Sequence, residues 1–378
     1  LNIEAKSMIL TFLRKIKSII DERKKISRIE RKFIIETKKF FKNNFKNLKI
    51  NTNTKNAVIS EMNGNFFMAI LNIFLVAFVA RIKNSKVIFI GYKNEFNQFS
   101  FRIIRKRLVK SDFFDFNDLT SNLKYKIQNE AKEIFSKIKS HNDLLNLKYK
   151  GIQIGDLIYD MSMRRKELKA SVWKIDDSIL EEIKIALTSF YSIDIIKNKY
   201  KINAIVTSDT IGTEYGVLLR YLNSQKIESY VGHGGTFMIK KYKSYNNGRY
   251  DPSYKMPTHL VNKLIKNRKN ELLKNANTYL NNRINGNVNN LDAKSAYDEK
   301  LLNFKSKGEF CKEYNLIEDK PIVIIMLHSF NDYCNHFNNM LYPDYYSWFI
   351  DTLKISKKIK NINWIFKEHP ACKYYPHD

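Results

Sequence analysis

"INAIVTSDTIGTEYGVLLRYLNSQKIESYVGHGGTF", residues 202–237, has the pattern of a strand, a helix and a second strand in succession. The run Ala204–Thr207 predicts a buried strand, residues 213–225 carry apolar positions at helical spacing, and residues 227–237 predict the next strand. Polar residues gather where these strands stop. Ligands of open α/β sheets bind at the carboxyl ends of the strands, so this stretch predicts an α/β fold and the edge that would carry a site.

Two further stretches carry the same pattern, the first in residues 57–92 and the second in residues 321–366. Each begins and ends with an apolar strand, and the connecting helix is expected over residues 66–82 in the first and 344–360 in the second. Asp344 lies at the start of the second helix, where a helix-capping residue is typical. The chain is therefore expected to contain two separate α/β units.

These units predict the domains. Residues 1–55 predict basic amphipathic helices, 56–258 a Rossmann-like first domain, 259–320 a helical linker, and 321–378 the start of a Rossmann-like second domain. Within the first domain, residues 112–150 are expected to be helical and linking. A nucleotide-binding domain usually needs about 100 residues or more, so we expect the natural protein to continue beyond this sequence.

The chain carries 66 Lys and Arg against 38 Asp and Glu, a formal net charge of +28. This excess suits nucleic acid, an anionic membrane or anionic small substrates as partners, and a composition rich in Lys, Asn and Ile, typical of an AT-rich genome, accounts for part of it. No nucleic-acid-binding motif occurs, so no nucleic-acid partner is expected. The basic amphipathic pattern of residues 1–50 suits either an anionic lipid surface or packing on a domain.

Cysteine content and hydropathy favour a cytoplasmic location. The three cysteines are too few and too scattered for a disulfide framework. The longest apolar stretch, residues 66–80, is shorter than the roughly 20 residues of a membrane span and contains Asn72, so it predicts a buried helix. Cys334 and His336 have poor metal-ligand spacing and no second ligand pair accompanies them, so no metal site is expected.

In the first domain, candidate chemistry follows two strands. Asp209 ends the first of them and would deprotonate an acceptor hydroxyl, or else cap the next helix. His233, Gly234, Gly235 and Thr236 follow the second strand. Glycines let the backbone turn its N–H groups to an anion, and the histidine would act as a general base or bind a phosphate. The alternative is a glycine turn with an exposed histidine.

In the second domain, polar residues again follow the strands. His328, Ser329 and Asn331 lie on the loop after the first strand, where phosphates often bind, and Asp332 would accept from sugar hydroxyls. The next strand ends at Lys367, Glu368 and His369, beside that loop. A Lys and a His together neutralise a phosphate, whereas the alternative is a polar strand end before a turn.

Three strings occur in order: G-H-G-G-T at 232–236, L-H-S-F-N-D at 327–332 and F-K-E-H-P at 366–370. Together they resemble the GT-B-like bacterial glycosyltransferases of capsule and lipopolysaccharide biosynthesis. The last is similar to the His-Pro motif of bacterial sialyltransferases and capsule deoxy-octulosonate transferases, which implies that His369, with Lys367 nearby, contacts the phosphate of a cytidine-nucleotide sugar. The first is similar to the W-H-G-T segment of teichoic-acid glycerophosphotransferases, with a glycine in place of the tryptophan, and this implies that its histidine is a base or a phosphate contact.

The resemblance implies twin Rossmann domains of the GT-B type. It also implies transfer of a sugar from a nucleotide-activated donor to a growing surface polysaccharide, at the inner face of the cytoplasmic membrane. The donor phosphate would meet His369, Lys367 and the loop 328–332, and the acceptor, a glycan or lipid-linked glycan, would meet Asp209 and His233. Positive side chains would offset the charge of the leaving nucleotide, so neither a metal nor a cofactor is expected.

Two other functions stay open on the same residues. A polyol-phosphate transferase of the CDP-glycerol kind would share the fold and the leaving nucleotide but would move a phosphoester. A non-catalytic protein with a degenerate transferase domain would instead serve as a scaffold in polysaccharide assembly. Transfer or hydrolysis of the donor, lost on replacement of His233 or Asp209, distinguishes an enzyme from a scaffold.

Overall fold

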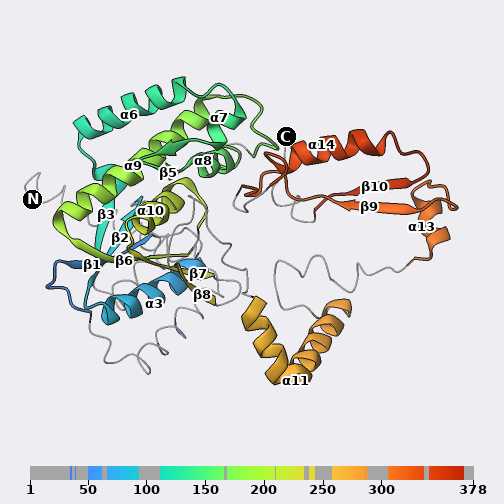
Figure 1. The fold of residues 1–378 in the computed structure, drawn as a ribbon, viewed down its shortest axis with the longest axis horizontal. Coiled ribbons are helices and arrows are strands. Elements are labelled where there is room, and N and C mark those ends of the chain that lie inside the picture. The colour runs from blue at the N-terminus through green and yellow to red at the C-terminus, as the bar shows by residue number, and fades with distance from the viewer. Residues whose placement is uncertain are drawn as a thin grey trace, which may run out of the picture. The chain divides into compact units, whose positions relative to one another are not determined.

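The computed structural model consists of two units (Figure 1). Unit 1 comprises Leu1–Met161 and Ile175–Ser253, and unit 2 comprises Ser162–Lys174 and Tyr254–Asp378. The structure describes residues 35, 39, 50–61, 66–92, 111–165, 168–208, 210–233, 238–242, 258–285, 287, 305–335 and 340–369. The predicted basic helices of the N-terminal segment therefore lie almost wholly outside the described residues.

The core of unit 1 is a six-stranded sheet with the strand order β3–β2–β1–β6–β7–β8. Every neighbouring pair is parallel except β7 with β8. The strands are β1 (Asn56–Glu61), β2 (Lys86–Gly91), β3 (Ser111–Asp115), β6 (Lys201–Thr207), β7 (Glu228–His233) and β8 (Met238–Tyr242). This mixed α/β architecture, with five parallel strands in a Rossmann-like sheet, confirms the α/β class predicted from the sequence.

Successive side chains of a strand point to opposite faces of the sheet, and here both faces carry apolar side chains. Helices therefore cover both faces. The helices are α3 (Phe66–Ile82), α9 (Asp177–Lys199) and α10 (Thr213–Ser224). On one face, Val58 and Val206 pack in a buried cluster with side chains of α3. On the other face, Ile59 and Ile205 pack with side chains of α9 and α10, and Figure 1 shows the helices on the two sides.

β1 and β6 are neighbours whose outgoing connections lie on opposite faces. From β1 the chain passes through α3 to β2, and from β6 it passes through α10 to β7. Two such connections leave the space between neighbouring strands open at their carboxyl ends, which is the topological switch point of an open α/β sheet. Ligands of such sheets bind there, so the residues that follow Glu61 and Thr207 form the edge at which a ligand of unit 1 is expected.

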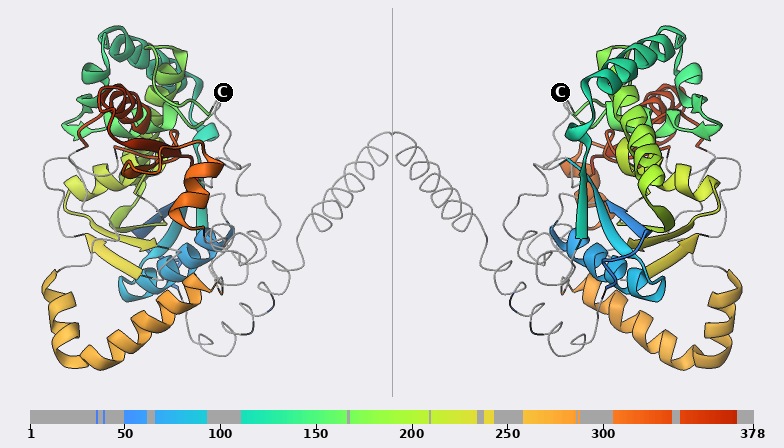
Figure 2. Two further views of the ribbon diagram at one scale, coloured as in Figure 1. Left: turned by 90° about the vertical axis from the view of Figure 1, so that its right-hand side faces the viewer. Right: turned by 90° about the vertical axis from the view of Figure 1, so that its left-hand side faces the viewer.

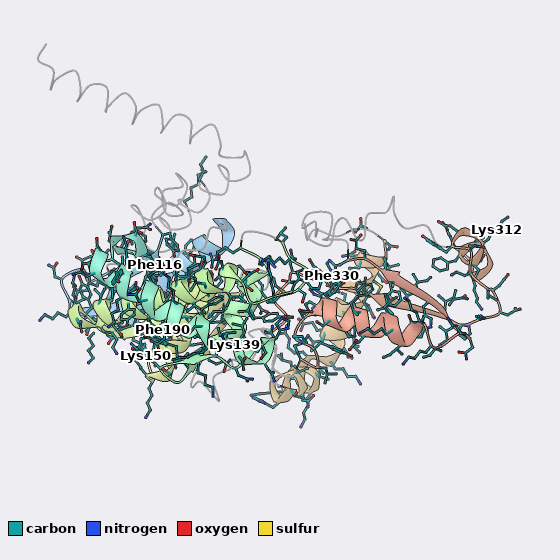
Figure 3. All side chains as sticks on the ribbon, turned by 90° about the horizontal axis from the view of Figure 1, so that it is seen from above. Phe116, Lys139, Lys150, Phe190, Lys312 and Phe330 are labelled. Carbon is teal, nitrogen blue, oxygen red and sulfur yellow. The ribbon has the colours of Figure 1, made fainter. Side chains whose placement is uncertain are left out.

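A second layer of unit 1 packs against α9. It contains α6 (Ser121–Ser136), α7 (His141–Leu145), the hairpin β4 (Lys148–Tyr149) and β5 (Ile152–Gln153), and α8 (Gly155–Ser162). Tyr149 of the hairpin and Tyr191 of α9 donate to the Glu130 carboxylate of α6 at 2.8 and 2.7 Å. Burial, and then the bond to Glu130, raise the pKa of Tyr149. Lys150 lies over the ring of Phe190, 6.0 Å from its centroid, and both are labelled in Figure 3.

Two strands differ from the prediction. The sequence predicts a helical segment from residue 112, whereas β3 occupies Ser111–Asp115, with Phe113 packed on the α3 face and Phe114 on the opposite face. The sequence also predicts one strand over residues 227–237, whereas β7 ends at His233 and β8 returns antiparallel from Met238. Both are edge strands with charged residues, a composition that protects sheet edges but weakens the apolar pattern used to predict strands.

The β7–β8 pair contains a charge cluster that predicts a pH effect. Glu228 accepts from Lys241 at 2.6 Å and from Tyr230 at 2.9 Å, and Lys83 lies 2.5 Å away. The bond to Lys241, followed by that to Lys83, lowers the pKa of Glu228 from 4.5 to about 2.

Because the pKa of Glu228 is lower in the folded than in the unfolded protein, the ionised Glu228 stabilises the folded state above pH 4.5. This stabilisation is lost as the pH falls toward 2. We therefore expect Glu228→Gln to be less stable than wild type near neutral pH, with a difference that shrinks as the pH falls through this window. Urea titrations at several pH values measure it. A difference that stays constant with pH would contradict the prediction.

Unit 2 contains a parallel pair of strands with a helix on one face. Its elements are α11 (Thr258–Ile284), α13 (Lys307–Glu313), β9 (Ile322–Met326), α14 (Tyr345–Ser356) and β10 (Asn363–Lys367). Phe349 of α14 packs edge-on against Phe366 of β10, with ring centroids 5.5 Å apart. The predicted start signal of α14 is confirmed, because the Asp344 side chain accepts from the backbone N–H of Ser347 at 2.7 Å.

Candidate functional site

The predicted residues of unit 2 meet at one edge of the β9–β10 pair. The strands are parallel, with Met326 opposite Lys367, so the chain leaves both at the same end. The Leu327 N–H donates to the Lys367 carbonyl at 2.9 Å and extends the pairing to the last residue of β10. The loop that starts at His328 therefore lies beside His369, as the sequence predicts.

His328 is the middle ring of a column of three. It stacks on Tyr345 at 4.3 Å with an interplanar angle of 15°, and on His369 at 5.5 Å with an angle of 23°. Its Nδ1 lies 3.2 Å from the Ser329 carbonyl oxygen and 3.8 Å from a carboxylate oxygen of Asp332. A carbonyl only accepts, so Nδ1 carries the proton and Nε2 is directed to the other side of the ring. The half-exposed ring can thus offer Nε2 to a ligand.

The other predicted loop residues divide between interior and surface. Ser329 and Asn331 are buried, and the Ser329 hydroxyl donates to the Asn331 side-chain oxygen at 3.0 Å. The Asn331 side-chain nitrogen has no acceptor among the described residues. Lys367 and Glu368 are exposed at the end of β10. The site therefore combines a fixed loop interior with solvent-accessible charged groups.

Arg164 is a residue of this edge that sequence reasoning missed. It lies in the segment Ser162–Lys174, which belongs to unit 2. Its guanidinium donates to Asp332 at 3.0 Å and lies over the Tyr333 ring, 4.6 Å from the centroid. The two consecutive arginines at 164 and 165 were the available signal, but no periodic pattern connects them to a loop so distant in the chain. Arg164 holds the carboxylate that faces His328.

The same segment supports the start of α14. Asp344 is fully buried, and the Ser171 hydroxyl donates to its carboxylate at 2.5 Å. Trp173 packs edge-on against Tyr346 at 4.7 Å. Phe330, labelled in Figure 3, packs on Tyr346 from the β9 loop at 5.5 Å. These contacts fix the end of α14 that carries Tyr345, and with it the ring column.

At the switch point of unit 1, a buried carboxylate joins the ends of β1 and β6. Glu61 is fully buried and accepts from the Ser208 backbone N–H at 2.7 Å and from the Ser208 hydroxyl. Its other oxygen accepts from the Asn72 side chain of α3 at 2.7 Å. In the sequence, Asn72 stands out only as the polar residue of an apolar run, and no local pattern singles out Glu61.

The remaining predicted residues of unit 1 lie outside the described set. Asp209, Gly234, Gly235 and Thr236 are not among the described residues, and of His233 the structure describes the backbone, at the carboxyl end of β7. β1, β6 and β7 are parallel neighbours, so the carboxyl ends of β6 and β7 lie at the same edge as Glu61.

No group of three His, Cys, Asp or Glu side chains suited to a metal ion occurs in the part of the chain that the structure describes. Among the same residues, no helix has the length and apolar character needed to cross a bilayer. No protein-family model, curated protein or solved structure matches the chain.

Proposed function

We propose that this protein is a glycosyltransferase of the GT-B type that uses a nucleotide-activated sugar, with the donor phosphate at the carboxyl ends of β9 and β10. The observation that carries the proposal is the pairing of His328 and His369, which come from different strands and stack at 5.5 Å. Lys367 and the two imidazoles in their protonated form would make a set of donors suited to a phosphate group, because a ring with its proton on Nδ1 donates through Nε2 only when it is charged.

The chemistry required of such a site is stabilisation of the leaving nucleotide. Charge develops on the phosphate oxygen as the bond to the sugar breaks, and donors already held in place stabilise it without reorganisation. Arg164 pairs with Asp332, whose carboxylate faces Nδ1 of His328 at 3.8 Å. This arrangement supports a His328 ring oriented with Nε2 toward the ligand. Positive side chains then take the role that a metal ion has in other transferases.

The acceptor is assigned to the switch point of unit 1, where Asp209 would act as the base and His233 would be a base or a phosphate contact. The bonds of Glu61 to Ser208 support this assignment, because they hold the residue that precedes Asp209. Gly234, Gly235 and Thr236 would bind substrate through the backbone. The acceptor would be a growing surface glycan at the cytoplasmic membrane, and the donor a cytidine nucleotide sugar.

Nucleotide binding by the full chain tests the proposal. We expect CMP or CDP, but not UDP or GDP, to raise the melting temperature. His328→Ala and His369→Ala should each abolish the shift, because each removes one of the two stacked rings. His259→Ala, on exposed helix α11, is the matched control and should keep it.

The outcomes separate the alternatives. A shift with UDP or GDP alone would exclude the cytidine assignment, and a shift that survives in both site variants would exclude the phosphate role. If cytidine nucleotides bind, incubation with CDP-glycerol and with cytidine-activated sugars distinguishes the polyol-phosphate transferase from the glycosyltransferase by which donor is consumed. Binding without consumption of either donor would favour the scaffold.

A further inference from the structure

Helix α11 (Thr258–Ile284) exposes large apolar side chains along its length. Leu264, Ile265, Leu273, Tyr279, Leu280 and Ile284 are between 41% and 57% exposed. Every α11 side chain that the structure describes is exposed or half-buried. The helix bends at Arg268, whose φ of −137° and ψ of 30° are not helical, and its two arms form a V in Figure 1 and Figure 2.

A helix in which no described side chain is fully buried lacks the usual source of helix stability. Helices in proteins derive most of their stability from packing an apolar face, not from helix propensity. The second arm of α11 has such a face: Leu272 and Leu273, Ala276, Tyr279 and Leu280, and Ile284 recur every three or four residues. Asn and Lys occupy much of the opposite side. This pattern indicates that a surface outside the described residues covers the apolar side.

The positive charge of α11 indicates what kind of surface covers it. α11 has six Lys and Arg residues and one acidic residue, Glu271. A second copy of the chain would bring a second helix of the same sign, and the net charge of +28 opposes self-association. A nucleic acid would match the charge but would leave the aliphatic side chains without an apolar partner. An anionic lipid surface satisfies both, because headgroups pair with Lys and Arg while apolar side chains enter the acyl boundary.

We propose that α11 is a membrane-docking element that lies in the plane of an anionic lipid surface, with Leu273, Tyr279, Leu280 and Ile284 directed into the acyl boundary. The proposal concerns α11 alone and does not depend on the nucleotide site of unit 2. It assigns the docking surface to described residues, separate from the basic N-terminal segment.

Vesicle sedimentation of the full chain tests the assignment. The vesicles contain phosphatidylcholine alone, or phosphatidylcholine with about one-third phosphatidylglycerol. We expect binding to the anionic vesicles only, weakened by salt. The triple variant Leu273→Ser, Leu280→Ser and Ile284→Ser should bind the anionic vesicles at least about tenfold more weakly than wild type does. Its matched control replaces Ile82, Ile317 and Leu341, which are 65%, 55% and 94% exposed elsewhere, with Ser and should bind as wild type does.

Tyr279→Trp provides a second measurement that does not depend on how much of the binding α11 supplies. The fluorescence of the tryptophan added at position 279 should shift to shorter wavelength with anionic vesicles and stay unchanged with neutral ones. Equal binding by wild type and the triple variant, together with no fluorescence shift of Trp at position 279, would overturn the proposal, as would equal binding to neutral vesicles. Lipid-free self-association that the triple variant abolishes would assign the apolar face to a second copy and would also overturn it.

Discussion

Replacing Arg220 with Ala should lower the free energy of unfolding of unit 1 by about 3–5 kcal/mol, because it leaves a buried carboxylate without its partner. Arg220 of α10 and Asp156 of α8 are 3% and 2% exposed and form two parallel hydrogen bonds of 2.6 and 2.7 Å. Arg220 also donates to the Gln153 carbonyl at 2.8 Å. Removal of the guanidinium therefore leaves the buried Asp156 carboxylate without the side chain that pairs with it.

Urea unfolding followed by circular dichroism measures this effect. The chain's three tryptophans, Trp173, Trp348 and Trp364, all belong to unit 2, so their fluorescence reports that unit separately. The double variant Arg220→Met with Asp156→Leu should recover most of the loss, because it removes both charges.

Lys137→Gln is the control for the Arg220 variant. It breaks the surface pair of Lys137 with Glu133, whose side chains are 70% and 68% exposed, and should have no measurable effect. An Arg220→Ala protein as stable as wild type would show that the buried pair contributes nothing net.

Replacing Glu61 with Ala should have the next largest effect, a loss of about 2–4 kcal/mol, since it leaves the Ser208 N–H and hydroxyl as buried donors without an acceptor. Glu61→Gln should lose less. Its side-chain oxygen can still accept from Ser208, while its amide group would face the Asn72 amide donor against donor. The order wild type, Gln variant, Ala variant in urea midpoint is the expected result.

Glu133→Ala, an exposed residue of α6, controls for the loss of a Glu and should leave the midpoint unchanged. If Glu61→Gln and Glu61→Ala are equally destabilised, the Ser208 bonds are not the source of the loss. If neither is destabilised, Glu61 does not hold the two strand ends together.

The strands and helices nearest the predicted sites could be read from local sequence. β9 and β10 were expected at residues 321–327 and 363–366 and occupy Ile322–Met326 and Asn363–Lys367. Apolar runs of this length predict a strand directly, and these two are strands although they are largely half-exposed. β3 and β8 were missed because edge strands are short and charged, and Lys241 of β8 has the character of a surface residue.

The residues of the candidate site also fall into those that local sequence predicts and those that it does not. His328 and His369 could be placed together because each follows a strand of one β-α-β unit, whose strands are parallel. Their binding of a phosphate stays a prediction. Arg164 could not be found, since its contact with Asp332 joins segments 168 residues apart. Glu61 was missed because its partner Ser208 comes from the pairing of β1 with β6, which no local pattern encodes.

The position of the segment Ser162–Lys174 in the chain limits where the coding sequence can be cut to produce unit 2 alone. It is inserted in the chain of unit 1, yet it supplies Ser171 to the buried Asp344 and Arg164 to Asp332. A polypeptide that begins at Tyr254 would contain the strands of unit 2 but would leave Asp344 without its hydroxyl donor. Unit 2 is thus completed by a segment that is encoded between the two parts of unit 1, so it cannot be produced whole from the coding region that follows unit 1.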